Sequence, residues 1–280
     1  YLNSPIIRSA TPIALSGPDE AGFEAGAARI ELVSGRVDTV FWSADPTVER
    51  TAEGGFRFAG RFGIWAERDG EPVAVSLVGG TTLTKNGQGL LLDEAEFRAE
   101  ITAVDHAART ITISPAPAAP GALVGQNLFI GNEKRSLAYE VLSVAEAADG
   151  VTLALSMDPR IGTGEVTSTE DFRVRTSTPF PLHGYGYYEG ARIRNADGSA
   201  EYRVNEVRNA GFAMIDRTLH PEATADALAA DFPPGTWFEV YDYGVGDEVW
   251  WPMSASLTQR APHTWEMGAG TQAQVNLPRE

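Results

Sequence analysis

The sequence contains no cysteine. This absence excludes disulfide bonds, thiolate metal sites and cysteine nucleophiles, although it leaves the redox compartment open. Basic residues are also few, because 22 Lys+Arg stand against 38 Asp+Glu and give a formal net charge of -16. A surface of this sign repels nucleic-acid phosphates and anionic lipid. We therefore expect neither a nucleic acid nor a membrane as a partner.

Long hydrophobic runs are absent as well. No stretch approaches the roughly 20 apolar residues that a membrane helix needs. The first residues, Tyr1 and Leu2, follow neither an initiator methionine nor a basic-then-apolar signal pattern, which favours a processed or excised chain. With 43% hydrophobic residues in a chain of 280, the composition is typical of a folded globular protein.

Short runs that alternate apolar and polar residues recur along the chain, separated by turn dipeptides. This pattern is typical of antiparallel β structure. The clearest hairpin covers residues 190–207 around Asp197-Gly198, and similar turns are predicted at Asp69-Gly70, Asn86-Gly87 and Asp149-Gly150. The predicted fold is therefore all-β, an antiparallel β-sandwich or partly closed barrel.

Two further segments shape the predicted organisation. Residues 97–104 and 109–114 form alternating arms around a four-residue connection, which places His106 on a turn. Residues 222–230 are the one run of good helix formers, so one short helix is expected there. Prolines in residues 115–121 exclude a central strand and favour a boundary between two β sub-domains, residues 1–116 and 117–280.

Motifs for nucleotides, zinc or a nucleophile elbow are missing, and the sequence predicts no cofactor. The histidines, His106, His183, His220 and His263, lack the spacing of metal ligands. We therefore expect surface or structural histidines and no metal site.

The densest group of reactive side chains lies in residues 183–192. His183, Tyr187 and Arg192 are the catalytic candidates, because abstraction of a proton beside a carboxylate needs a base, an acid and a cation that neutralises the carboxylate. Tyr185, in the same segment, is a candidate for substrate binding. Packing of alternating aromatic residues on a strand explains the same pattern without any catalysis.

A second aromatic group lies near the C-terminus: Tyr241, Tyr243, Trp250 and Trp251. Aromatic faces stack on sugar rings, so these residues are candidates for substrate binding. Exposure separates two interpretations, since an exposed row favours glycan binding and burial favours a role in packing.

Several segments occur in an order that resembles the C-terminal all-β region of bacterial heparinase II/III-like polysaccharide lyases. They are RVDTVF (36–41), FAGR (58–61), LVGGT (77–81), VDHAARTITI (104–113), LVGQNLFI (123–130) and YDYGVGD (241–247). The resemblance implies a role next to the substrate cleft of an enzyme that cleaves uronic-acid glycans by β-elimination. It also implies an N-terminal α/α toroid as a partner in the same precursor. None of the family's catalytic residues maps onto a position of this sequence.

The sequence thus predicts the C-terminal β-rich part of a secreted or periplasmic polysaccharide lyase whose partner is an acidic glycan. The net charge opposes such a ligand unless clustered arginines form a local basic cleft. The alternative is a non-catalytic module of a larger secreted protein that binds neutral sugars or other glycans through a Trp/Tyr surface, or that packs on another domain. A β protein of a virion or an appendage is a third possibility.

Overall fold

Antiparallel sheets account for nearly all regular structure in the computed structural model, which describes residues 6–17, 24–181, 186–208, 211–261, 264–269 and 273–276. The predicted all-β fold is confirmed. Among the described residues there is one short α-helix and one 3-10 turn.

The chain divides into two compact units. Unit 1 comprises Tyr1–Phe97 and Trp251–Glu280, and unit 2 comprises Arg98–Trp250. These boundaries differ from the predicted division at residue 116. The proline-rich segment links two strands inside unit 2, and the last strands of the chain return to pair within unit 1. Local composition could not reveal this return, because it depends on pairing between distant segments.

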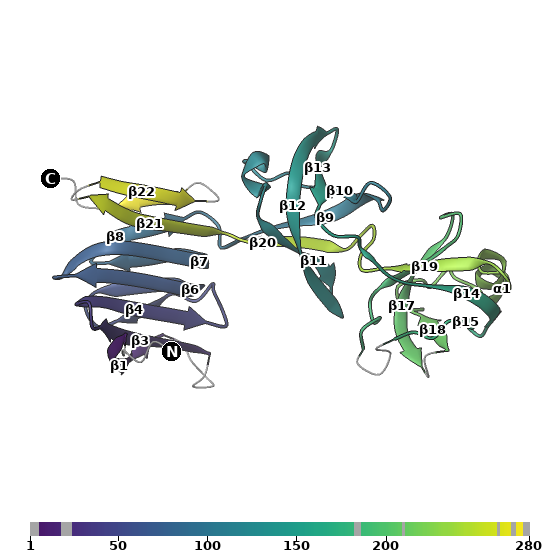
Figure 1. Cartoon of the computed structure of the whole chain (residues 1–280), viewed down its shortest axis with the longest axis horizontal. Helices are drawn as coiled ribbons and strands as arrows, with labels where there is room; N and C mark the ends of the chain where they lie inside the picture. Colours follow the sequence, from purple (N-terminus) through teal and green to yellow (C-terminus); the bar gives the residue numbers. More distant parts are fainter. Residues whose placement is uncertain are drawn as a thin grey trace. The chain divides into compact units, whose positions relative to one another are not determined.

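Unit 1 is a β-sandwich whose main strand order is β1-β3-β4-β6-β7-β21-β22 (Figure 1). Strand β5 pairs with β6 and also with β2, while β8 pairs with β7 and also with β23. The bounds are β1 Ile7–Ile13, β2 Leu15–Ser16, β3 Ala25–Leu32, β4 Arg36–Ser43, β5 Arg50–Ala52, β6 Phe56–Arg68, β7 Glu71–Lys85, β8 Gln88–Leu92, β21 Ser254–Ala261, β22 Thr264–Ala269 and β23 Ala273–Asn276.

The long strands β6 and β7 belong to both halves of the sandwich, and glycines let them run very close together. A Cβ added at Gly80 would lie 2.3 Å from the Cα of Gly60, so no larger residue fits there. The enclosed core contains Phe41, Phe58 and Trp65, each at most 2% exposed. Burial of these large apolar side chains is the main stabilising contribution to unit 1.

Unit 2 contains two closed barrels. The first has the strand order β10-β13-β12-β11-β20-β9, and the second has the order β14-β15-β18-β17-β16-β19. The bounds are β9 Glu96–Asp105, β10 Thr110–Ser114, η1 Pro120–Leu123, β11 Asn127–Asn132, β12 Arg135–Ala147, β13 Gly150–Leu155, β14 Arg160–Glu170, β15 Arg173–Thr176, β16 Arg192–Asn195, β17 Glu201–Arg208, β18 Phe212–Ile215, α1 Ala225–Asp231, β19 Trp237–Tyr241 and β20 Glu248–Pro252.

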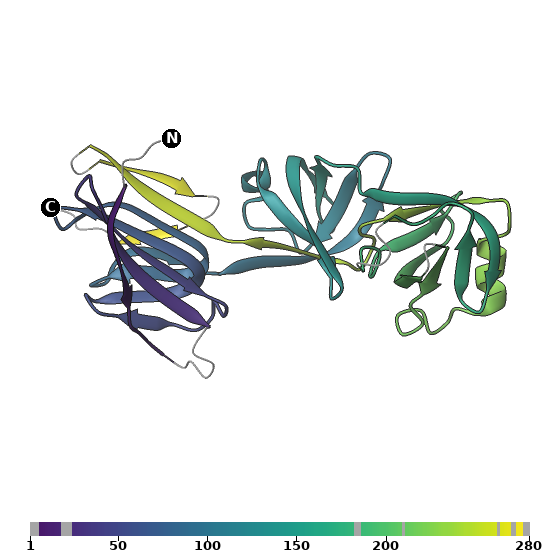
Figure 2. The ribbon, with the colours of Figure 1, turned by 60° about the horizontal axis from the view of Figure 1, so that its bottom comes forward.

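The helix α1 packs beside β14 of the second barrel (Figure 2). It starts three residues later than expected, because the side chain of Thr224 caps it by accepting a hydrogen bond from the Ala227 N–H at 3.1 Å. Leu228 is fully buried in the core of this barrel.

Two predicted hairpins matter for the site. Strands β16 and β17 pair around the Asp197-Gly198 turn, and β9 and β10 pair around the turn that carries His106, so both predictions are confirmed. In the second turn, Asp105 accepts a hydrogen bond from the Ala108 N–H at 2.9 Å. Arg109 closes this turn with a φ of +55°, a conformation that is uncommon for a residue with a side chain.

Candidate functional site

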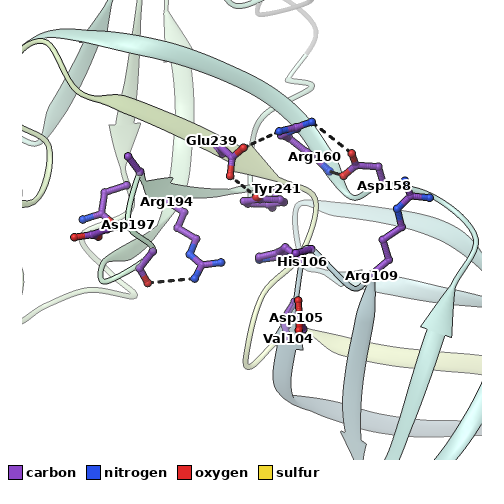
Figure 3. Close-up of a pocket in the computed structure, with 14 residues that line it drawn as sticks. Val104, Asp105, His106, Arg109, Asp158, Arg160, Arg194, Asp197, Glu239 and Tyr241 are labelled. Atoms are coloured by element: carbon purple, nitrogen blue, oxygen red, sulfur yellow. Dashed lines mark hydrogen bonds and ion pairs between the residues drawn. The ribbon is translucent and has the colours of Figure 1, made fainter.

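A polar pocket of about 640 Å³ lies within unit 2, where the two barrels meet (Figure 3). The first barrel contributes the β9–β10 turn, and the second contributes the start of β14, the β16–β17 turn and β19. The lining residues are Val104, Asp105, His106, Ala107, Arg109, Asp158, Arg160, Arg194, Asn195, Ala196, Asp197, Gly198, Glu239 and Tyr241.

Two stacked rings form the wall between the barrels. The ring centroids of His106 and Tyr241 are 3.7 Å apart, and the planes differ by only 9° (Figure 3). The His106 side chain is 5% exposed, and Nε2 lies 3.8 Å from a carboxylate oxygen of Glu201. Among the described residues, its Nδ1 has no hydrogen-bond partner. This nitrogen is itself buried from solvent, so it carries the cost of an unsatisfied polar atom and is not open to a ligand in the pocket.

Three charged side chains, each bound to the next, hold the phenol of Tyr241 in place by a hydrogen bond. Arg160 lies 3.7 Å from Asp158 and donates to Glu239 at 2.7 Å, and Glu239 in turn accepts a hydrogen bond from the Tyr241 hydroxyl. Burial and the hydrogen bond to Glu239 raise the pKa of Tyr241. The same hydrogen bond and the Arg160 guanidinium lower the pKa of Glu239. The phenol therefore stays protonated and the carboxylate stays ionised around neutral pH.

The β16–β17 hairpin brings a second set of polar groups to the pocket. Arg194 is the strand partner of Glu239, and its guanidinium also donates to the Gly198 carbonyl at 3.3 Å. Asp197 accepts hydrogen bonds from the backbone N–H of Ser199 at 2.9 Å and from its hydroxyl at 2.6 Å, and these bonds lower the pKa of Asp197. The turn thus presents a cation and an ionised carboxylate within a few residues.

A buried ionic cluster joins the two barrels behind the pocket. The side chain of Asp247 is completely buried and accepts hydrogen bonds from Arg192 at 2.9 Å, from the Gly244 N–H at 2.8 Å and from Asn132 at 3.2 Å. Arg203 donates to the same carboxylate. Asn132 belongs to the first barrel, whereas Arg192 and Arg203 belong to the second. The Asp247 carboxylate is therefore hydrogen-bonded to both barrels.

A second buried cluster lies on Asp242, directly after β19. Its carboxylate accepts hydrogen bonds from Arg135 and from the hydroxyl of Tyr139, both on β12 of the first barrel. Burial raises the pKa of both Asp242 and Tyr139. These two buried clusters therefore connect the two barrels of unit 2 by hydrogen bonds, while the core of the second barrel is apolar.

The structure does not gather the predicted catalytic residues in this pocket. His183 and Tyr185 lie outside the described residues. Arg192 is 8% exposed and bound to Asp247, which gives it a structural role in place of the predicted neutralisation of a substrate. Tyr187 is 39% exposed and lies near Arg135, which donates to its carbonyl at 2.8 Å. Neither Tyr187 nor Arg192 lines the pocket.

Of the other predicted binding residues, only Tyr241 lines the pocket. Tyr241, Tyr243 and Trp251 are 6%, 1% and 4% exposed, and burial of this degree favours packing. Trp250 is half-buried and stacks on Phe129 with ring centroids 5.8 Å apart. These residues therefore form no exposed aromatic row.

Sequence reasoning missed most of the pocket. His106 was expected as a surface or structural residue, whereas Arg109, Arg160, Arg194 and Glu239 carried no motif at all. The sequence offered one signal for the position of this pocket, which was the turn predicted at residues 105–109. Polar side chains on a tight turn at a barrel rim are often accessible to ligands.

Comparison with known proteins identifies neither a family nor a function for the chain. No protein-family model, curated protein or solved structure matches the chain. No helix in the described part of the chain is long and apolar enough to span a membrane. Within the same residues, no group of three or more His, Asp or Glu side chains is arranged to hold a metal ion.

Proposed function

We propose that this chain is a glycan-binding β module of a larger carbohydrate-active protein, and that the pocket of unit 2 holds the saccharide. The observation that carries the proposal is the mixture of donors and acceptors around the stacked rings of His106 and Tyr241. A sugar presents hydroxyl groups that both donate and accept hydrogen bonds. A volume of about 640 Å³ is in the range of small-ligand sites, so the pocket has room for a few sugar rings at most.

The pKa shifts of three lining groups favour hydrogen bonding over proton transfer by those groups. A general base works best with a pKa near the operating pH. The pKa of Tyr241 is raised further above neutrality, and those of Glu239 and Asp197 are lowered further below it. These three groups are therefore suited to donate or accept hydrogen bonds without exchanging a proton.

A polysaccharide lyase is the second candidate function, in line with the resemblance described above. The observation that favours it is that His106, Tyr241 and Arg109 line one pocket. In β-elimination a base removes the proton next to the uronate carboxylate, a cation stabilises the resulting negative charge, and an acid protonates the leaving oxygen. In this pocket His106 would be the base, Arg109 the cation and Tyr241 the acid.

One experiment on the full chain distinguishes the two candidate functions. Soluble polygalacturonate, alginate, xylan and glucomannan are offered separately, with binding followed by affinity electrophoresis and lyase action by ultraviolet absorbance of the unsaturated product. We expect retardation by at least one polysaccharide and a flat absorbance trace. A rise in absorbance that disappears in His106→Ala would replace the binding module with a lyase. Absence of both signals would contradict both candidates.

A further inference from the structure

The charges that line the pocket are almost balanced. Four carboxylates face three guanidiniums, so the lining holds no excess of arginine. The clustered arginines that an acidic glycan would need on a chain of net charge -16 are therefore not found here.

One arginine is already engaged within the protein. Arg160 pairs with Asp158 and Glu239. These three side chains are already bound to one another, so they are less available to bind a ligand. This triad carries one net negative charge, and the Arg194 guanidinium is close enough to help lower the pKa of Glu239.

The remaining charged groups form a set of both signs. Arg109 and Arg194 supply two cations, while Asp105 and Asp197 supply two anions. Within the described part of the chain, none of these four side chains takes part in an ion pair. Figure 3 shows Arg194 and Arg109 on opposite sides of the His106 and Tyr241 rings. The pocket therefore offers two cations and two anions that form no ion pair, although Asp105, Asp197 and Arg194 already make hydrogen bonds within their own turns.

This arrangement suits a ligand whose groups can both donate and accept hydrogen bonds. A sugar hydroxyl can accept from a guanidinium and donate to a carboxylate, and hydrogen bonds to charged groups are the stronger kind. A uronate carboxylate can only accept, so it would use the arginines and leave Asp105 and Asp197 facing a like charge.

We infer that the pocket selects a neutral, hydroxyl-rich saccharide over an acidic one. The inference rests on the proposed glycan-binding function and names its ligand class. It runs against the acidic glycan that the family resemblance implies and agrees with the neutral sugars of the alternative predicted from the sequence. It also conflicts with the lyase candidate, which requires a uronate in this pocket.

Calorimetric titration of the full chain tests the inference. The probes are cellotetraose, xylotetraose, mannotetraose and tetragalacturonate, each at low and high salt. We expect at least one neutral tetrasaccharide to bind about tenfold more tightly than tetragalacturonate, with an affinity that salt does not change, because no net charge is transferred. Arg194→Gln and Asp197→Asn should each weaken the neutral ligand about tenfold, since each removes a charge-assisted hydrogen bond.

Three results would overturn the inference in distinguishable ways. Tighter binding of tetragalacturonate than of every neutral probe, weakened by salt and by Arg194→Gln, refutes the neutral ligand and leaves the glycan-binding function standing. An unchanged tetragalacturonate affinity in Asp197→Asn would show that the Asp197 charge does not disfavour the acidic ligand, which also counts against the inference. Failure of every probe to bind refutes the proposed function itself.

Discussion

Replacing Asp247 with alanine is expected to lower the free energy of unfolding of unit 2 by about 3–5 kcal/mol, the range for breaking a buried ion pair by removing one partner. The carboxylate is completely buried, and its loss leaves the guanidiniums of Arg192 and Arg203 in the interior without their shared anion. The Gly244 N–H and the amide of Asn132 lose an acceptor as well.

Urea unfolding, followed with hydrogen exchange to separate the two units, measures this loss. The matched control is Glu248→Ala, at the neighbouring position. Glu248 pairs with Arg98 at 3.0 Å while both side chains are more than half exposed, and such a pair contributes about 0–1 kcal/mol. Exchange protection in the sandwich core around Trp65 should stay as in the wild type. Equal losses in the two variants would show that Asp247 does not hold the barrels together.

The largest expected effect on binding comes from Ala107→Trp. Ala107 is exposed on the β9–β10 turn and lines the pocket, so an indole at this position occupies ligand space without removing any described hydrogen bond. We expect the affinity for the best-bound saccharide to fall by about thirtyfold or more, which corresponds to about 2 kcal/mol. Calorimetry with the same saccharide measures the change.

Ala108→Trp is the matched control for this variant. Ala108 is the next residue on the same turn, is also exposed, and does not line the pocket. Its backbone N–H bonds to Asp105, and a larger side chain leaves that bond in place. The control should bind as the wild type does. If both variants bind equally well, the saccharide does not occupy this pocket.

The hairpins of this chain could be predicted because their signals are local. Asp69 and Asn86 adopt positive φ just before Gly70 and Gly87, as expected for tight turns between adjacent strands. The Thr110–Ser114 strand alternates buried and half-buried residues as its sequence indicates. Turn chemistry and alternation therefore identify strand pairs that are neighbours in the sequence.

The division into units and the pocket could not be predicted in this way. Strand β21 pairs with β7, and the ring of His106 stacks on Tyr241, although both pairs are far apart along the chain. Such contacts depend on the closure of whole barrels and sheets, which no local pattern specifies. The same limit explains Arg192, which looked catalytic beside Tyr187 in the sequence but pairs with the distant Asp247 in the fold.

The central claim is that a saccharide binds between the two barrels of unit 2. Its most direct test is a titration of the isotope-labelled full chain with the best-bound saccharide, followed by nuclear magnetic resonance of the backbone amides. We predict shifts concentrated at residues 105–109, 194–198 and 239–241, with those of unit 1 unchanged. Shifts confined to unit 1, or to parts of unit 2 remote from these three segments, would contradict the claim.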